Sequence, residues 1–399
     1  MIVTHTRFEG SWFCRVRRPS LHDLTQLLTL ITLTFSVSVP AAVSAEKTPR
    51  ATSPKTPSTT PARHFVQRED VQRFADEVAE RHGLPPAWVR TQLAAATWVG
   101  PVRKFIMPPP PGTAKNWAAY RAIFVEPRRI KAGLDFWRKH QLWLQRAEER
   151  WGVPPEIVVA IIGVETFYGG ISGNYRVLDA LATLAFDFPP GRKDRSEFFR
   201  SELEQLLILS AREGIAASSL RGSFAGAIGL PQFMPGSINR WAVDFDEDGH
   251  IDLRHNAADA IGSVAHYLAA FGWQKDLPTH YDVAVPVDAA DRAFLLGPDI
   301  LPSFSAAQFV ERGALLPDPA IAHDGLLALV EMQNGATAPS YYAGTSNFYA
   351  ITRYNWSSYY AFAVIELAAA LVRQGCSGAG SAAPGHNTRC ALISSKNHS

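Results

Sequence analysis

The spacing of apolar residues predicts a mainly helical chain. From Val71 to about Trp151 these residues recur at helical intervals, in stretches such as DVQRFADEVAERHG and GLDFWRKHQLWLQRAEERWG that each end at a glycine. The pattern indicates a bundle of helices. Further helices are expected in EFFRSELEQLLILSARE, in the segment after Asn256, and in SSYYAFAVIELAAALVRQ.

One stretch, PPEIVVAIIGVETFYGG, has the pattern of a central helix. Prolines stand where a helix can begin, and glycines stand where it ends. The residues between Ile157 and Val164 are apolar on every side, which is typical of a helix with no face toward water. We therefore expect this helix to be buried in the core.

Residues 280–350 do not follow the helical period. They carry short alternating runs such as LLALVEMQ beside an Asn-Gly pair, a pattern that indicates strands joined by a tight turn. A small β insertion is expected here, at about 280–350. We find no internal repeat of about 20 to 50 residues, so a solenoid is not indicated.

The first 45 residues have the features of a cleaved secretory signal. Arginines at positions 15, 17 and 18 precede an apolar stretch from about Leu24 to Val39, and the small residues of AAVSA follow. This stretch is shorter than the roughly 20 residues that span a bilayer, so a cleaved signal is favoured over an uncleaved anchor. Cys14 precedes the apolar stretch and cannot be the lipid-modified cysteine of a lipoprotein. Export to the periplasm, without a stable membrane anchor, is expected.

Two further segments are expected to be flexible. Residues 46–62 are rich in Pro and Thr and form a leader, and residues 375–399 form a tail rich in Gly, Ala and Ser. The tail holds Cys376 and Cys390, which could pair in an oxidising compartment. A local disulfide is favoured there over a catalytic or metal site.

The overall charge excludes one class of partner. The 399 residues include 39 Lys and Arg against 37 Asp and Glu, so there is no basic field to attract nucleic acid. With 47% hydrophobic and 19% charged residues, the chain is expected to fold as a soluble protein. Its length is enough for two or three domains with a sizeable core.

Glu165 is the candidate catalytic residue. It is the only charged residue between positions 157 and 175, and Ile161 and Val158 precede it by one and two helical turns. Desolvation and the negative end of the helix dipole both raise the pKa of such a carboxyl group, which is the state that a general acid needs. Alternatively, Glu165 reaches solvent past the glycines that follow, or pairs with an arginine such as Arg176.

Several long motifs then resemble a known family. GVETFYGGISGNYRVLDALATLAFDFP, LRGSFAGAIGLPQFMPGSINRWAVDFDEDGHIDL, DAIGSVAHYLAAFGW and NFYAITRYNWSSYYAFAV closely resemble the lytic murein transglycosylase B family, in this order and at comparable spacing. The similarity runs from about residue 65 to 374. It implies a lysozyme-like catalytic domain with an additional helical part and a small β insertion. It also implies that the substrate is the glycan strands of peptidoglycan.

The resemblance implies a reaction as well as a fold. The family cleaves the β-1,4 bond between N-acetylmuramic acid and N-acetylglucosamine and leaves a 1,6-anhydro ring. By this resemblance Glu165 protonates the leaving oxygen and then takes the proton of the muramic C6 hydroxyl. Ordinary glycoside hydrolysis uses two carboxylates, whereas an attacking group within the substrate makes a second one unnecessary. No cofactor is required for this chemistry.

Other functions stay open at this point. A second carboxylate beside Glu165 would make the protein a hydrolytic muramidase, and the candidates are Asp179, Asp187 and Glu202. A third possibility is a non-catalytic peptidoglycan-binding scaffold that keeps the groove.

The resemblance also indicates residues that bind substrate. In GSFAGAIGLPQFMP, small residues let the backbone approach a ligand, while Ser223 and Gln232 supply neutral polar groups; the alternative is a tight packing loop. Pro231 removes one backbone donor from this loop. Further groove residues implied by the family are mostly aromatic, which suits sugar rings, although most aromatic residues are simply part of the core. They are Tyr120, Tyr267, Tyr354, Asn355 and Tyr360.

The loop DFDEDGHIDLRH has the spacing of an EF-hand. Asp244, Asp246 and Asp248 take positions one, three and five, and His250 supplies the carbonyl at position seven. Position twelve is His255, a poor ligand for a hard cation. Asp252 at position nine could supply the missing oxygen, with Asn256 next to the twelfth place. A structural calcium ion that braces the loop is expected, and the alternative is a solvated acidic turn.

Overall fold

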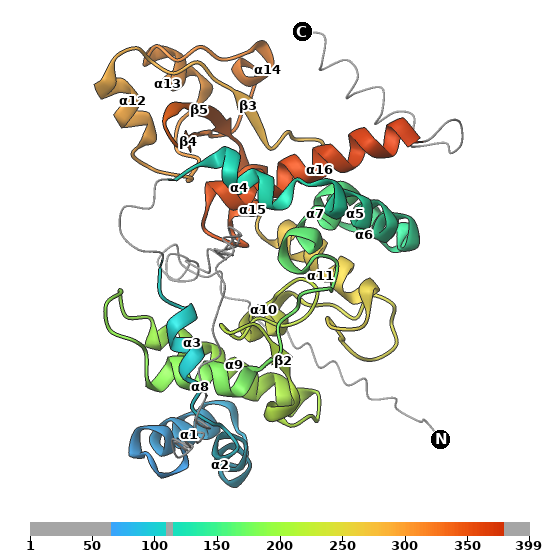
Figure 1. The fold of residues 1–399 in the computed structure, drawn as a ribbon, viewed down its shortest axis with the longest axis vertical. Helices are drawn as coiled ribbons and strands as arrows, with labels where there is room; N and C mark the ends of the chain where they lie inside the picture. Colours follow the sequence, from blue (N-terminus) through green and yellow to red (C-terminus); the bar gives the residue numbers. More distant parts are fainter. Residues whose placement is uncertain (1–64, 109–114, 379–399) are drawn as a thin grey trace, which may run out of the picture.

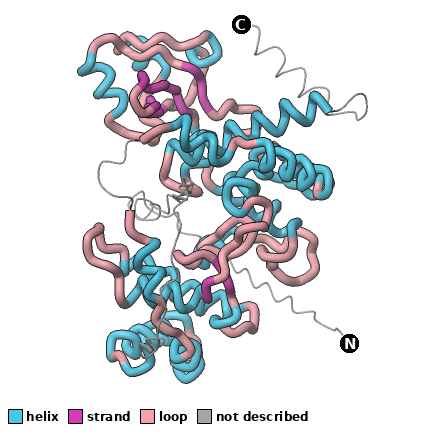
Figure 2. Tube along the Cα trace, in the orientation of Figure 1, coloured by secondary structure: helices cyan, strands magenta, loops and turns pink. Residues whose placement is uncertain are grey.

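The computed structural model describes residues 65–108 and 115–378, and most of these residues are helical (Figures 1 and 2). The molecule is longest along one axis. Its first two long helices lie at one end, and a small sheet with three short helices lies at the other (Figure 1). The predicted signal (1–45), the predicted leader (46–62) and Cys390 lie outside the described residues.

The chain before the central helix forms the helices that its apolar spacing predicts. They are η1 (Phe65–Gln67), α1 (Glu69–His82), α2 (Pro86–Ala94), α3 (Gly100–Phe105), α4 (Trp117–Phe124), α5 (Pro127–Lys139) and α6 (Gln141–Trp151). Gly83 and Gly152 end α1 and α6 with φ of 63° and 69°, in the left-handed region that favours glycine. α1 packs on α2, whereas α5 and α6 pack on the central helix.

The central helix is α7 (Pro155–Thr166), and the prediction that it is buried is confirmed. Every residue of α7 is buried except its two glutamates, Glu156 and Glu165. The neighbours of α7 include α5, α6, α11 (Ala257–Ala270) and the long helix α16 (Ser358–Gly378). Glu165 is therefore carried on the last turn of a helix that the surrounding helices hold rigidly.

The segment from β1 to α10 lies in the lower half of the molecule in Figure 1, together with α1 to α3. Its elements are β1 (Tyr175–Arg176), α8 (Val177–Phe186), α9 (Ser196–Arg212), η2 (Ala217–Ser219), β2 (Arg221–Gly222) and α10 (Pro235–Trp241). The two short strands pair antiparallel, with Tyr175 opposite Gly222. This pairing anchors the loop that begins at Ser223. The same loop contacts the end of α7, where Thr166 bonds to Leu230.

The predicted β insertion is present, and it also contains helices. Strands β3 (His280–Asp282), β4 (Ala328–Asn334) and β5 (Thr337–Gly344) form one antiparallel sheet in the order β3-β5-β4, and the hairpin turns at the expected Asn-Gly pair. Gly335 has φ 66° in this turn. The helices are α12 (Ala289–Leu296), α13 (Ala306–Glu311) and α14 (Asp318–Ile321). A separate hydrophobic cluster around Phe309 and Leu329 forms the core of the insertion.

The last two helices return the chain to the centre. α15 (Ser346–Thr352) follows the sheet, and α16 packs on α4, α5 and α7. α16 continues to Gly378, so it includes the first four residues of the segment predicted as a tail from residue 375. Cys376 on this helix is disulfide-bonded, and its pairing with Cys390 stays a prediction. None of the helices in the described ranges combines the length and the apolar character needed to cross a membrane.

Candidate active site

The end of α7 is fixed in an unusual backbone conformation. Phe167, Tyr168 and Gly169 follow the helix with φ of 52°, 58° and 90°, so that three residues in succession are left-handed. The buried hydroxyl of Thr166 secures this turn, since it donates to the Leu230 carbonyl at 2.9 Å and accepts from the Gly169 amide at 3.0 Å. The turn thereby holds the last helical turn of α7 against the loop that contains Leu230.

Glu165 is only partly accessible and has a specific partner. The Tyr360 hydroxyl on α16 donates to Glu165 Oε1 at 2.6 Å, across 195 positions of sequence. Burial raises the pKa of Glu165 to about 7, against the lowering effect of this hydrogen bond. Arg176 does not neutralise the carboxyl group, because it pairs with Asp179 at 3.3 Å. Glu165 is thus protonated over much of the pH range below neutrality.

Three of the predicted groove tyrosines form a cluster next to Glu165. The rings of Tyr354 and Tyr360 stack with centroids 6.3 Å apart, and Tyr267 lies 4.8 Å from Tyr354. The Tyr267 hydroxyl donates to the Arg353 carbonyl at 2.6 Å, whereas the buried Tyr354 hydroxyl has no hydrogen-bond partner among the described residues. An unsatisfied buried hydroxyl beside an acid is a group that a ligand can satisfy.

Tyr120 approaches the carboxyl group from a different helix. It lies on α4, with its ring 5.2 Å from Phe124 and 5.8 Å from Tyr359. Burial, reinforced by the nearby Glu165 carboxylate, raises the pKa of Tyr120. The same two causes raise the pKa of Tyr354 and of Tyr360. These phenols therefore keep their protons and can act as hydrogen-bond donors.

Asn355 lies beside this cluster. It follows Tyr354 directly, is partly exposed, and accepts a hydrogen bond from the Ser357 amide through its carbonyl at 2.6 Å. Its place in the chain, between Tyr354 and the start of α16, puts it at the same end of that helix as Tyr360.

Ser223 and Gln232 both contribute to a tight loop, as the packing alternative predicts. The Ser223 hydroxyl accepts from the Ala227 amide at 3.0 Å, and the Gln232 amide nitrogen donates to the carbonyls of Gly229 and Ser172 at 2.9 and 3.2 Å. Each side chain nevertheless keeps one polar group that these hydrogen bonds do not use. The hydroxyl still has its own proton, and the amide still has its oxygen, so both can also contact a ligand.

The three alternative carboxylates are engaged elsewhere. Asp179 accepts from the Thr97 amide at 2.9 Å, and Asp187 accepts from the Trp98 indole at 2.5 Å, so both fix the connection between α2 and α3. Glu202 accepts from the Gly236 amide at 2.7 Å, at the start of α10. These contacts bind the three groups to other elements and do not place any of them as a partner of Glu165.

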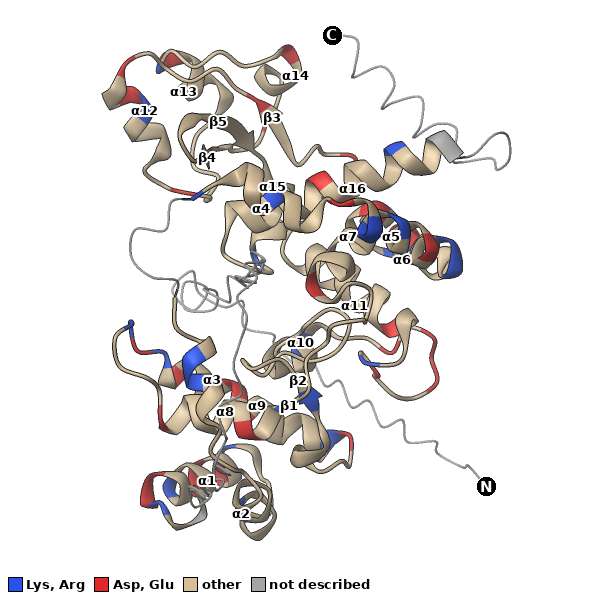
Figure 3. Ribbon diagram, viewed as in Figure 1, with Lys and Arg blue, Asp and Glu red and all other residues tan. Residues whose placement is uncertain are grey.

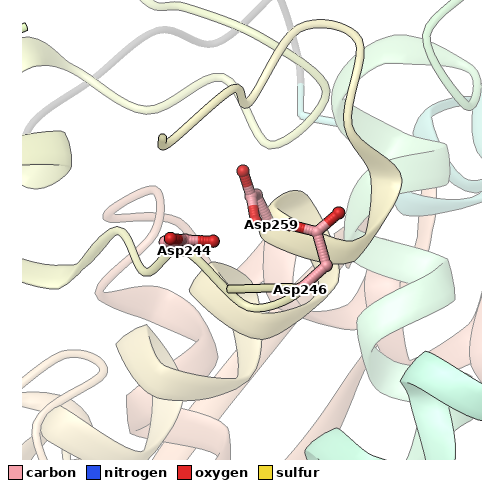
Figure 4. Close-up of side chains that lie close together, drawn as sticks. All are labelled: Asp244, Asp246 and Asp259. Atoms are coloured by element: carbon pink, nitrogen blue, oxygen red, sulfur yellow. The ribbon is translucent and has the colours of Figure 1, made fainter. Parts of the chain in front are cut away.

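The acidic loop between α10 and α11 brings together a set of ligands that differs from the predicted set. Figure 4 shows Asp244, Asp246 and Asp259, which each offer a carboxylate oxygen within 4.8 Å of the others. Asp259 is fully buried on the first turn of α11 and accepts from the amides of Phe245 and Asp252, both at 2.8 Å. Sequence analysis missed Asp259 because it lies four residues beyond a twelve-residue loop.

The other predicted loop residues lie outside this group. Asp248 accepts from the His250 amide at 2.9 Å, so these two residues bond to each other. Asp252 faces the exposed ring of His255, with 3.0 Å between Oδ2 and Nδ1. Three carboxylates so close together suit a hard divalent cation, and the donor set therefore fits calcium.

Comparisons with known proteins match almost all of the described chain. A family model described as a transglycosylase SLT domain matches residues 66–369. Membrane-bound lytic murein transglycosylase B of Escherichia coli K12 is 38% identical over 315 residues, which cover 77% of this chain and 84% of that protein.

Solved structures of lytic transglycosylases show about the same sequence identity to this chain. The crystal structure of soluble lytic transglycosylase SltB1 from Pseudomonas aeruginosa has a TM-score of 0.69 and 38% identity, covering 78% of this chain and 100% of that chain. The structure of Escherichia coli lytic transglycosylase Slt35 in complex with calcium has a TM-score of 0.65 and 36% identity, covering 77% of this chain and 93% of that chain.

Proposed function

Because the chain belongs to the transglycosylase SLT family and is a lytic murein transglycosylase with a mainly helical, lysozyme-like fold, we propose that Glu165 alone performs both proton transfers of the reaction. The observation that carries the proposal is the enclosure of this carboxyl group at the end of the buried helix α7. Its pKa is raised to about 7, and a tyrosine hydroxyl fixes its orientation at 2.6 Å. The three other carboxylates considered are occupied at other positions.

The reaction then follows in two proton transfers. Glu165 donates its proton to the glycosidic oxygen of the β-1,4 bond between N-acetylmuramic acid and N-acetylglucosamine, and the bond from that oxygen to the muramic C1 breaks. The muramic C6 hydroxyl attacks C1, and its proton passes to the Glu165 carboxylate. The new bond closes the 1,6-anhydro ring, and the acid is restored. The attacking group is held within the sugar, so no water molecule has to be positioned.

The surrounding polar groups bind the glycan in this proposal. Tyr354 carries a buried hydroxyl without a partner, and the hydroxyl proton of Ser223 and the amide oxygen of Gln232 can bond to sugar groups. Tyr120 and Asn355 are partly exposed and complete the surface near Glu165, whereas the buried Tyr360 orients the carboxyl group. The buried Tyr267 packs on Tyr354. Aromatic faces with polar edges are suited to pyranose rings.

Digestion of purified murein tests this function. We expect soluble muropeptides with anhydro ends, which borohydride does not reduce. Reducible ends would instead establish a hydrolytic muramidase, and the absence of soluble products would establish a binding scaffold.

We also propose that Asp244, Asp246 and Asp259 hold a structural calcium ion. The close approach of three carboxylates and the calcium complex of the related Slt35 support this proposal. Figure 3 shows acidic residues along this loop between α10 and α11. The ion would brace the loop and has no part in the chemistry.

Removal of calcium is expected to lower the melting temperature. An ion present at about 100 times its Kd adds about 2.7 kcal/mol, which corresponds to roughly 4 °C for a chain of this size. Differential scanning fluorimetry with and without EGTA measures this difference. Asp259→Asn should abolish it, whereas Glu247→Gln, which removes an exposed acid of the same loop, should keep it. A wild-type melt that does not respond to chelator would exclude the site.

The cell wall is the place of action implied by the substrate. We propose that residues 1–45 direct export to the periplasm, where peptidoglycan is accessible.

A further inference from the structure

Arg129 connects the ends of the two helices that carry Glu165 and Tyr120. Its Nη1 donates to the Gly163 carbonyl in the last turn of α7 at 2.5 Å. Its Nη2 donates to the Ile123 carbonyl, at the end of α4, at 3.4 Å. One side chain of α5 therefore bonds to carbonyl groups near the carboxyl-terminal ends of two other helices. The Gly163 carbonyl also accepts from the Phe167 amide at 3.0 Å.

The guanidinium group is enclosed by aromatic rings. Its central carbon lies 4.9 Å from the ring centroid of Phe167 and 5.3 Å from that of Phe124. Burial lowers the pKa of Arg129, and its Nε has no hydrogen-bond partner among the described residues. The group is thus held by two rings and two carbonyls, an arrangement that suits a planar guanidinium and not an ammonium.

One ring packs on the active site, and the other follows it directly in the chain. Phe124 packs against Tyr120 with centroids 5.2 Å apart. Phe167 is the first of the left-handed residues after α7, and Gly163 precedes Glu165 by two positions. Movement of the guanidinium would therefore change the relative position of the acid on α7 and the phenol on α4.

We propose that Arg129 is a positioning residue for the transglycosylase reaction, which fixes Glu165 relative to Tyr120 by capping α7 and α4 together. This inference rests on the proposed role of Glu165 as the acid. Arg129 does not touch the reacting atoms.

The charge of Arg129 has a second consequence. A cation at the end of α7 offsets the negative pole of that helix, which otherwise favours the protonated form of Glu165. Among the described residues, the other titratable groups around Glu165 are phenols: Tyr120 on α4, Tyr267 on α11, Tyr354, and Tyr360 on α16. Further charged groups are Arg353 and Arg240, which act on Tyr267, and Glu126, which acts on Arg129. The inward residues of α6, Leu144 and Ala147, carry no charge. Loss of the Arg129 cation should therefore shift the alkaline limb of activity to higher pH.

Steady-state kinetics of Arg129→Gln, Arg129→Lys and Arg128→Gln on soluble glycan strands tests the inference, at a temperature below every melting midpoint. Arg128 is the matched control because it is exposed and its central carbon lies over the same Phe167 ring at 5.5 Å. For Arg129→Gln we expect kcat to fall at least tenfold with KM within twofold, and the alkaline limb to move up. Arg128→Gln should behave as the wild type does.

Arg129→Lys separates charge from geometry. It should return the alkaline limb to its wild-type pH, because the charge is kept. It should restore only part of kcat, because an ammonium group cannot cap both helices. This variant also keeps the test decisive if Arg129→Gln melts below the assay temperature. Full wild-type kcat in Arg129→Lys, or identical kinetics in Arg129→Gln and Arg128→Gln, would overturn the inference. Such a result would leave the function intact, whereas an active Glu165→Gln enzyme would remove the basis of both.

Discussion

Replacement of Glu165 by Gln is expected to lower turnover of murein by roughly a thousandfold or more. A general acid or base alone contributes about 10² to 10⁴ in rate, and here one residue serves in both steps. Glutamine can still accept the hydrogen bond from Tyr360, which keeps the local structure, but it cannot donate and recover a proton. Release of soluble muropeptides from purified sacculi measures the loss.

The same substitution should not destabilise the protein. The pKa of Glu165 is raised in the folded state, from 4.5 to about 7. The unfolded chain therefore ionises first as the pH rises, and wild-type stability falls between about pH 4.5 and 7. Glu165→Gln removes this loss, so its melting temperature should equal that of the wild type near pH 4 and exceed it at pH 8. A lower melting temperature at both pH values would mean that lost activity reflects misfolding.

The pH dependence of kcat/KM should show a single limb above neutrality. The free enzyme needs protonated Glu165, so the rate should fall about tenfold per pH unit above roughly pH 7. A hydrolase with a second, ionised carboxylate would add an acid limb near pH 4 and give a bell-shaped profile. Rates on soluble glycan strands between pH 4 and 9 distinguish these cases.

Tyr360→Phe extends this prediction. The hydrogen bond from Tyr360 lowers the pKa of Glu165, so its removal should move the alkaline limb to higher pH. Tyr341→Phe is the matched control, because Tyr341 donates to Glu331 at 2.7 Å in the β insertion, far from the site in the fold. If the limb stays in place in Tyr360→Phe, or moves equally in both variants, Glu165 is not the titrating group.

Much of the helical framework could be predicted from the sequence, because it follows from local patterns. α7 is recognisable from its continuous apolar stretch between prolines and glycines, and α1 and α6 from one apolar face and a terminal glycine. α8 has no such signal, since every one of its residues is buried and no polar face marks the period. The helices of the β insertion are short, so they carry too few turns to establish a period.

Fewer features of the active site than of the helical framework could be predicted from the sequence, because they depend on contacts between residues far apart in the chain. The raised pKa of Glu165 could be predicted from its apolar neighbours, but its bond to Tyr360 joins residues 195 positions apart, a distance that no local pattern spans. Asp259 was missed for the same reason, because its carboxylate belongs to a helix and only folding brings it to the loop. The resemblance to a family supplied the groove residues that periodicity could not separate from the core.

In the proposed reaction the substrate's own C6 hydroxyl, and not water, attacks the anomeric carbon, while Glu165 donates and then recovers the proton. Digestion of murein in ¹⁸O-labelled water, followed by mass spectrometry of the released ends, tests it most directly. We expect anhydro ends that contain no ¹⁸O. Reducing ends that carry the label would contradict it.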